Sequence, residues 1–396
     1  MIRRPPRSTL SSSSAASDVY KRQIVSKEGI MLERFHVSDE DAVRINHKKM
    51  HSVTKQVFMK MGLSEENADL SADVLIYADL NGVDTHGVSN MLRSYVRMYQ
   101  LEKINPRPDI KIVKESISTA ALDGDKGLGL HTAPYAMKLA INKAKESGVG
   151  IVTLNNAGHL GAAGFHAKLA VDEDMIGVCM SGGGGFAMLP TFGAEPRFGT
   201  QPIAWAAPAD KEAYFMFDAA MTQIAGNKIK LLERLETPVA SNWLANEDGS
   251  PINDEKLLSK EDFHEDGRLK NLHMLPLGGE RENGSHKGYG FAAIVDIMCS
   301  MLGGARAGFL GGSGHYFAAY NIDSFSDKKT FKANMDDFLR GLKETPPAPG
   351  HDRVLYPGLA EFESRNDRSE NGIPYHPEVI EWFESITSEL EIKLDW

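Results

Sequence analysis

The sequence contains little cysteine and no long apolar run. Its 396 residues include two cysteines, Cys179 and Cys299, and both lie in apolar segments. Two such cysteines do not form a disulfide framework, so we expect a reducing compartment, the cytoplasm. A membrane-spanning helix needs about 18 or more consecutive apolar residues, and no stretch approaches that length. We therefore expect no membrane association.

The chain also lacks an excess of basic residues. Its formal net charge is −10, and apolar and charged residues make up 42% and 25% of the sequence. This balance is typical of a globular protein and argues against a broad surface for nucleic acid. We therefore expect no nucleic-acid partner.

Common metal and nucleophile motifs are missing as well. His159 and His166 are seven residues apart, and neither an H-E-x-x-H string nor a cysteine pair accompanies them. The sequence therefore predicts no metal site. It contains neither a Walker A string nor the nucleophile elbow of serine hydrolases.

A glycine run after residue 180 satisfies the G-x-G-x-x-A dinucleotide fingerprint only formally, through Gly182, Gly184 and Ala187. The fingerprint must open a helix, and Pro190 and Pro196 prevent one there. A conventional dinucleotide fold is not expected from this run. A flexible loop is the alternative interpretation.

Residues 1–30 are predicted to be a non-native or disordered tail. Residues 1–23 carry five basic residues and one acidic residue, which leaves −14 for the remainder of the chain. Arginine-rich and serine-rich composition is typical of an organelle transit peptide, but the string also resembles translated sequencing adapter. We favour the artefact, because Pro5-Pro6 and the serines prevent an amphipathic helix. The native start would then be Met31 or lie upstream of Ile24.

The remaining pattern predicts an α/β fold with a helical part. Helical periodicity begins at Ser38 and resumes at Ser64 and after Gly87, which predicts an N-terminal helical region over residues 31–118. Residues 119–310 are predicted to form an α/β layer that is at least partly parallel. Its expected strands cover residues 118–122, 149–154, 175–180, 203–207 and 214–217. Its expected helices cover residues 131–146, 162–173 and 289–302. Residues 311–396 add a strand at 315–320 and a helix at 377–390.

A first candidate site is Asp84-Thr85-His86-Gly87, at a turn between two predicted helices. Helical spacing places Asn90, Arg93 and Arg97 on one face with His86. An imidazole that moves a proton and a guanidinium that binds a carboxylate would suit a small carboxylate substrate. The alternative is a helix-capping histidine with solvated arginines.

Two further clusters lie where helices are expected to begin. The string at residues 155–164 (NNAGHLGAAG) follows a predicted strand, and backbone amides there suit a phosphate or pyrophosphate; a tight turn is the alternative. The string at residues 285–290 (SHKGYG) places His286 and Lys287 at a helix start, where cations oppose the helix dipole. That placement favours phosphate or carboxylate binding over a solvated turn.

Six strings in order resemble the type 2 malate/L-lactate dehydrogenase family, which includes ureidoglycolate dehydrogenase, diketogulonate reductase and piperideine-carboxylate reductase. They are DTHGVS (84–89), NNAGHLGAAG (155–164), FGTQPIAWAAP (198–208), FDAAMT (217–222), SHKGYGFA (285–292) and YPG (356–358). The resemblance implies a homodimeric NAD- or NADP-dependent oxidoreductase that interconverts 2-hydroxy and 2-oxo acids. It also implies a non-Rossmann α/β domain and a helical domain built from both chain ends.

The resemblance further implies roles for individual residues. His86 would donate or accept the proton, with Thr85 beside it, and Asp218 would orient that histidine and raise its basicity. His159 would lie at the nicotinamide, and in some members the equivalent histidine moves the proton. Asn90 and Arg93 would bind substrate. The implied cofactor-binding residues are His159, Leu160, Gly161, Ala162, Ala163, Asp218, Ala219, Thr222, His286, Lys287 and Gly358.

Three residues depart from the family pattern. Asn90 stands where an arginine is common, Gln201 replaces asparagine in the GTNP string, and Leu359 replaces a glutamate. The first change points to Arg93 as the carboxylate-binding residue, and the third leaves the choice between NAD and NADP open. Two other functions stay as alternatives: a nucleotide-binding dimer without turnover, and a metal-assisted hydrolase using His86, His159 and Asp218.

Overall fold

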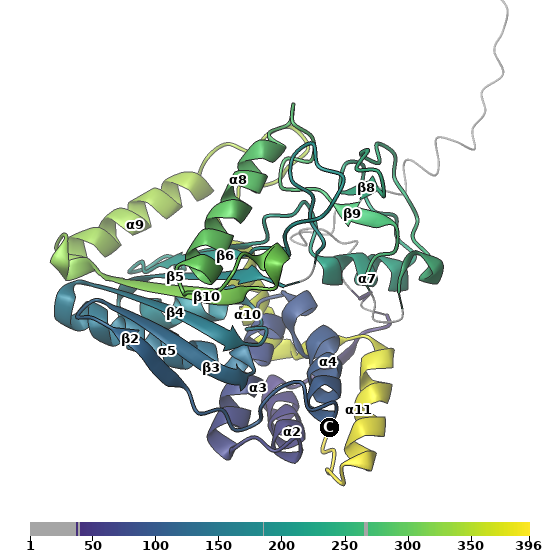
Figure 1. Cartoon of the computed structure of the whole chain (residues 1–396), viewed down its shortest axis with the longest axis horizontal. Helices are drawn as coiled ribbons and strands as arrows, with labels where there is room; N and C mark the ends of the chain where they lie inside the picture. The colour runs from purple at the N-terminus through teal and green to yellow at the C-terminus, as the bar shows by residue number, and fades with distance from the viewer. Residues whose placement is uncertain (1–36, 39, 185, 265–267) are drawn as a thin grey trace, which may run out of the picture. The chain divides into compact units, whose positions relative to one another are not determined.

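The fold is built on a seven-stranded sheet, seen in a computed structural model that describes residues 37–38, 40–184, 186–264 and 268–396 (Figure 1). The strand order is β2-β3-β4-β10-β5-β6-β7. These strands are β2 (Lys111–Glu115), β3 (Thr119–Gly127), β4 (Val149–Ala157), β5 (Met175–Gly183), β6 (Ile203–Ala207), β7 (Phe215–Ala219) and β10 (Ser313–Asn321). The tail predicted over residues 1–30 lies outside the described residues.

The sheet is mostly antiparallel. β3 and β4 pair in parallel, which confirms the expectation of a partly parallel layer, whereas the other hydrogen-bonded neighbours are antiparallel. β10 inserts between β4 and β5, so that Phe317 lies opposite Val152 on one side and Cys179 on the other. Because both neighbours run antiparallel to β10, the carboxyl ends of β4 and β5 lie at the same edge of the sheet.

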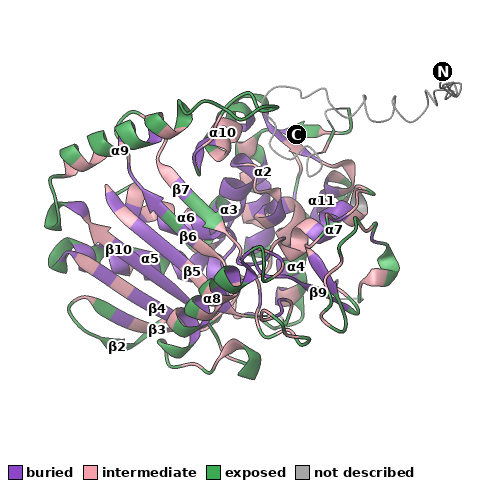
Figure 2. Cartoon of the chain, turned by 90° about the horizontal axis from the view of Figure 1, so that it is seen from above, coloured by how far each residue is buried: buried purple, intermediate pink, exposed green. Residues whose placement is uncertain are grey.

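Helices cover both faces of this sheet. The hydrophobic core of one face contains buried residues of α5 (Gly129–Ser147) and α6 (Ala163–Val171). On the other face, Val178 packs with residues of α8 (Ser285–Asp296) and of the π-helical turn Ile297–Met301. The central strands β4, β5 and β10 are largely buried, whereas β2 at the edge of the sheet is exposed (Figure 2). Alternation along β5 sends neighbouring side chains to opposite cores, as the two-residue period of a strand requires.

Both ends of the described chain meet in a second hydrophobic core. It contains buried residues of α2 (His47–Lys60), α3 (Glu65–Leu80), α4 (Val88–Gln100) and α11 (Pro377–Glu389). In addition, β1 (Val43–Ile45) pairs with β11 (Ile373–Tyr375). The His86 turn, which joins α3 to α4, is therefore supported by segments more than 280 residues further along the chain.

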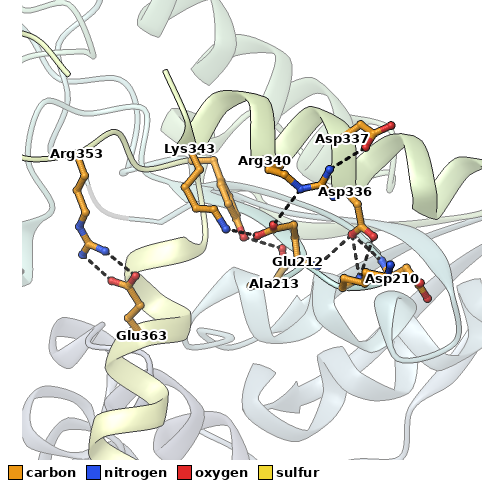
Figure 3. Close-up of polar contacts among 11 residues, drawn as sticks. Asp210, Glu212, Ala213, Asp336, Asp337, Arg340, Lys343, Arg353 and Glu363 are labelled. Atoms are coloured by element: carbon orange, nitrogen blue, oxygen red, sulfur yellow. Dashed lines mark hydrogen bonds and ion pairs between the residues drawn. The ribbon is translucent and has the colours of Figure 1, made fainter. Parts of the chain in front are cut away.

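The remaining elements connect these layers. They are α7 (Gly226–Arg234), β8 (Leu244–Asn246), β9 (Leu272–Met274), α9 (Lys328–Lys343) and α10 (Leu359–Asn371). The Asp336 carboxylate of α9 accepts hydrogen bonds of 2.9–3.1 Å from the backbone N–H groups of Asp210, Lys211 and Glu212 (Figure 3). These bonds hold α9 against the loop between β6 and β7.

Most predicted helices are confirmed, but two helix starts were wrong. The helix predicted from Ser38 begins at His47, because β1 occupies residues 43–45 and the Asn46 side chain caps the helix by accepting from the Lys48 N–H. The helix predicted from Tyr289 begins at Ser285, after Gly284 with φ +100°. The described residues from Val37 onward form one compact unit, and the domain boundaries at residues 118 and 310 stay predictions.

The described part of the chain gives two further findings. None of its helices combines the length and the apolar character that crossing a membrane requires. Cys179 and Cys299 are buried free thiols on the strand and the π-helical turn that meet in the sheet core. Burial raises the pKa of both thiols, so neither is a reactive thiolate.

Candidate active site

His86 ends a short 3-10 turn, Asp84–His86, between α3 and α4. The Thr85 hydroxyl lies 3.0 Å from His86 Nδ1. The buried Asp79 carboxylate accepts from the Val88 N–H at 3.0 Å and so caps α4. A Cβ atom on Gly87 would lie 1.6 Å from the Asp79 carboxylate, so this position requires glycine.

Contacts from α10 and β11, in the C-terminal part of the chain, hold the Asp84–His86 turn in place. The Arg368 guanidinium of α10 pairs with the Asp84 carboxylate and donates to the Asp79 carbonyl. The Tyr375 hydroxyl of β11 donates to the Asp79 carboxylate at 2.8 Å. Burial raises the pKa of Asp79 to about 7, and the nearby Asp84 carboxylate adds to that shift. These contacts fix the position of His86 relative to the rest of the helical part.

His159 faces His86 from the other side of the site. It follows β4, and the two imidazoles are nearly parallel, with ring centroids 5.8 Å apart and an interplanar angle of 17°. The Tyr95 hydroxyl of α4 lies 2.7 Å from His159 Nδ1, and the Gly161 N–H donates to the same nitrogen at 3.2 Å. Because a backbone N–H is always a donor, Nδ1 of His159 is an acceptor and the neutral ring carries its proton on Nε2.

Both imidazoles are neutral at ordinary pH. Burial, with smaller contributions from His159 and Lys228, lowers the pKa of His86 to about 3. Surrounding protein lowers the pKa of His159 to about 4, although its ring remains accessible to solvent. The expectation that Asp218 raises the basicity of His86 is corrected here, because the pKa of His86 moves in the opposite direction.

Asp218 instead contacts the start of α6. Its carboxylate accepts from the Gly164 N–H at 2.6 Å, where the first turn of the helix has free donors. Burial raises the pKa of Asp218 to about 6, and Glu361 of α10 shifts this pKa further upward. A carboxyl group with one oxygen on a helix N-terminus can still offer its other oxygen to a hydroxyl group.

The residues predicted to bind substrate are already engaged elsewhere. The Asn90 amide donates to the Asp84 carbonyl at 2.7 Å and so stabilises the turn. The Arg93 guanidinium lies 3.6 Å from the Glu378 carboxylate and 5.4 Å from the Trp382 ring centroid, both on α11. Asn90 and Arg93, which were predicted to share one helix face with His86, therefore make their contacts in two different places, the turn and α11. It is Tyr95 that α4 presents toward His159.

The predicted cofactor residues lie on several segments, some of which are joined by hydrogen bonds. The loop from His159 to Ala163 leads into α6, whose Gly164 N–H meets Asp218. Just after β7, the Met221 N–H donates to the Thr200 carbonyl, and the Met221 carbonyl accepts from the Leu277 N–H. The second bond connects the end of β7 to the segment that precedes His286 and Lys287. Thr222 is buried and its hydroxyl has no hydrogen-bond partner among the described residues. Gly358 has φ +100° and packs against Met216, which a Cβ atom would approach to 2.9 Å.

The structure adds four residues that sequence reasoning missed. They are Tyr95, which has the spacing of a core residue, Asn227 and Lys228 of α7, and Glu361. The Asn227 amide donates to the Thr85 carbonyl at 2.8 Å, and Lys228 lies close enough to His86 to lower its pKa. Residues 226–234 contain no recognisable motif, so no sequence signal favoured selecting Asn227 or Lys228. Glu361 lies three residues after Gly358 of the YPG string, and that string is the one signal that could have drawn attention to it.

A metal centre is not formed by the described side chains: within this part of the chain, no group of three or more histidine, cysteine, aspartate or glutamate residues is placed to hold an ion. In particular, Asp218 bonds a backbone amide and lies outside the stacked pair of His86 and His159. What the site offers is two neutral imidazoles, a hydroxyl group on each side and a nearby ammonium group.

Comparisons with known proteins agree with one another. A family model described as malate/L-lactate dehydrogenase matches residues 45–384. The chain is 36% identical to malate dehydrogenase of Pyrococcus abyssi over 92% of its length and 99% of the relative's. It is also 36% identical to L-sulfolactate dehydrogenase of Methanocaldococcus jannaschii, over 86% and 95% of the two lengths. The crystal structure of malate dehydrogenase from Entamoeba histolytica superposes with a TM-score of 0.84, at 32% identity and over 90% and 100% of the two chains.

Proposed function

Because this chain belongs to the type 2 malate/L-lactate dehydrogenase family, we propose that it is an NAD- or NADP-dependent oxidoreductase that interconverts a 2-hydroxy acid and a 2-oxo acid. The observation that carries this proposal is the stacked pair of His86 and His159, each bonded to a hydroxyl group. Reduction of a carbonyl requires a proton at its oxygen, and a positioned imidazole supplies it.

We assign the proton transfer to His86. The Thr85 hydroxyl both donates and accepts, so it supports either neutral tautomer of His86 and leaves Nε2 free to give or take a proton. His159 has a fixed tautomer, because its Nδ1 is already an acceptor. A bound carboxylate substrate adds negative charge beside the rings, which raises the pKa of His86 above its value in the free enzyme.

Lys228 is the cation best placed to bind the substrate carboxylate. Its charge acts on His86, and burial lowers its own pKa, so it is a partly desolvated ammonium group beside the reacting atoms. Arg93 is held by α11 and Asn90 by the turn. Their roles as substrate-binding residues stay predictions, with Lys228 as the stronger candidate.

The described residues fit a nicotinamide dinucleotide. The unpartnered Thr222 hydroxyl, the Asp218 carboxyl and the side chains of His286 and Lys287 at the start of α8 offer partners for ribose hydroxyl and phosphate groups. When bound, the nucleotide would give or accept the hydride. The chain's own residues would hold and orient it without a Rossmann motif, because the sheet is mostly antiparallel and the described residues between β5 and β6 contain no helix.

We also propose a cytoplasmic homodimer. Apolar side chains of α8 and of the π-helical turn are exposed on the side away from the sheet, among them Phe291, Ile294 and Ile297. A stripe of this kind on a helix commonly packs against another protein surface. A second copy of this chain is the partner that the family resemblance implies.

The test is an absorbance assay at the nicotinamide band. NADH and NADPH are supplied separately with oxaloacetate, pyruvate, 2-oxoglutarate and 3-sulfopyruvate, the last because sulfolactate names a relative. Oxidation of either nucleotide with any of these acids supports the proposal. Nucleotide binding with no turnover would favour the silent dimer, and a hydrolytic activity that a chelator abolishes, without nucleotide oxidation, would favour the metal-assisted hydrolase. If neither nucleotide binds, the proposal is wrong.

A further inference from the structure

A second pocket lies outside the candidate active site, between α2, α3, α6 and α10. Its cavity measures about 450 Å³ and is lined by residues of all four helices, including His47, Lys48, Tyr77, Lys168 and Arg365. None of the residues assigned above to the nucleotide, the substrate or the proton lines it. Cavities of about 300–1,000 Å³ are the size that small ligands occupy.

Positive charge dominates the lining. Two carboxylates face the pocket, Asp73 and Asp172, and both are already paired. The imidazole of His51 lies 2.9 Å from the Asp73 carboxylate, and the Lys168 ammonium lies 2.6 Å from the Asp172 carboxylate. The other three basic side chains that face the pocket have no carboxylate partner among the described residues: His47, Lys48 and Arg365. A chain that is acidic in total thus gathers uncompensated cations at one cavity.

Two nitrogen atoms in this lining have no hydrogen-bond partner. They are Nη1 of Arg365 and Nδ1 of His47, and both atoms are buried. The Arg365 guanidinium lies over the Tyr77 ring, 5.8 Å from its centroid, which holds it in place. Neighbouring Lys48, Arg365 and His51 charges add to burial in lowering the pKa of His47. The Arg365 nitrogen is always a donor, and a buried donor without an acceptor costs free energy that an anion in the pocket would relieve.

We infer that this pocket binds a small molecule through its phosphate group, with Arg365 as the main ligand and His47 and Lys48 beside it. A guanidinium presents a planar fork of donors that matches the oxygens of phosphate, and a phosphate dianion offsets the charges of both unpaired cations, Lys48 and Arg365. The cavity has room for more than the phosphate itself. Arg365 lies one turn before Arg368 on α10, so the occupant contacts the helix that holds Asp84.

The test is isothermal titration calorimetry of the full-length protein with inorganic phosphate, at constant ionic strength. We expect wild type to bind phosphate, and Arg365→Gln to weaken the affinity at least tenfold, as expected for a lost charge-assisted hydrogen bond. Arg353→Gln is the matched control, because Arg353 pairs with Glu363 on the exposed side of α10 (Figure 3). That variant should bind phosphate as wild type does.

Two further variants keep the result interpretable. Arg365→Lys preserves the charge without the fork and should bind with intermediate affinity, and it guards against a folding defect in Arg365→Gln. Lys287→Gln removes a cation at the proposed nucleotide site and should leave phosphate binding unchanged. Succinate in place of phosphate distinguishes a dicarboxylate site, and tighter succinate binding would overturn the phosphate assignment. The inference also fails if wild type releases no heat of binding, or if Lys287→Gln alone abolishes it.

Discussion

Two stacked imidazoles set the chemistry at the scale of single residues. His86 and His159 both have lowered pKa values, so both rings are neutral before substrate binds. Thr85 and Tyr95 occupy one nitrogen of each ring and leave the other for substrate or nucleotide. A neutral ring is ready to act as a base, and as an acid it must first gain a proton.

Replacing His86 tests the proton assignment. His86→Ala should lower kcat by about 100-fold or more, because it removes a positioned general acid and base. The variant should still bind NADH or NADPH, measured by quenching of nucleotide fluorescence, since the predicted nucleotide partners lie elsewhere. His351→Ala, an exposed histidine, serves as the control. Full activity in His86→Ala would transfer the role to His159.

The two reaction directions should differ in their dependence on pH. With a free-enzyme pKa of about 3 for His86, the base form predominates above that pH, so kcat/KM for oxidation of the hydroxy acid should not fall through imidazole protonation between pH 5 and 8. Reduction needs the protonated ring, so its kcat/KM should fall about tenfold per pH unit over the same range. Both profiles are measured in Asp218→Asn as well, because the pKa of Asp218 is about 6. An inflection near pH 6.5 that persists in that variant would contradict the neutral His86.

At the scale of elements, three segments converge on one short turn. α3 supplies Asp79, α10 supplies Arg368 and β11 supplies Tyr375, and together they hold Asp84 and the start of α4. A 3-10 turn of three residues has little stability of its own. Its geometry therefore depends on these long-range contacts.

Breaking the Arg368–Asp84 pair should destabilise the fold. Arg368 is 5% exposed and the Asp84 side chain 24%, so Arg368→Met leaves a partly buried carboxylate without its partner, at a cost approaching the roughly 3–5 kcal/mol in the free energy of unfolding that a fully buried pair loses. Urea denaturation measures this change. Arg353→Met removes an ion pair whose members are about 40% exposed, and such surface pairs contribute about 0–1 kcal/mol. Equal losses in the two variants would show that the buried pair does not hold the turn.

Asp79 should make stability depend on pH. Its folded-state pKa of about 7 exceeds the unfolded value of 3.8, so the folded state binds the extra proton. The stabilising contribution of the neutral carboxyl is complete below about pH 4 and is lost as the pH rises through 7. In Asp79→Asn the free energy of unfolding should therefore decline less between pH 4 and 7, measured by urea denaturation at each pH. Asp367→Asn, on the exposed side of α10, should decline as wild type does.

At the scale of the whole molecule, the outer side of α8 is the main unexplained apolar surface. Its residues Phe291 and Ile294 are about half exposed, as is Ile297 in the following turn, whereas Val295 and Cys299 are buried against the sheet. The helix thus has an apolar face on both sides. Burying the outer one against a second copy would remove that surface from water.

A charge in this face should prevent dimer formation. Ile294→Glu would place an unpaired carboxylate in the proposed interface, so sedimentation equilibrium at micromolar concentration should show monomer where wild type shows dimer. Ile117→Glu is the control, because Ile117 is 73% exposed and lies outside this face. A wild type that sediments as monomer, or an Ile294→Glu variant that remains dimeric, would disprove this interface.

Short-range signals were sufficient for much of the fold. The helix predicted from Ser64 is α3, which Ser64 caps, and the β-rich run at residues 203–207 located β6 to the residue. Local signals failed where pairing with a distant segment decided the outcome. Residues 43–45 form a strand because residues 373–375 lie beside them, and β10 enters the middle of the sheet although its neighbours precede it by more than 100 residues.

The sequence by itself determined the family, the glycine and histidine strings of the site, and the approximate position of the predicted helices, because these features depend on residue type and short spacing. Only the tertiary structure decided that His159 stacks on His86, that Arg93 turns to α11 while Lys228 approaches the site, and that Asp218 bonds a helix N-terminus. Each of these depends on which elements pack together and on the burial that results. Burial also lowers the pKa of His86, opposite to the expected direction. Desolvation depends on all the atoms packed around the ring, so the local amino-acid sequence does not reveal it.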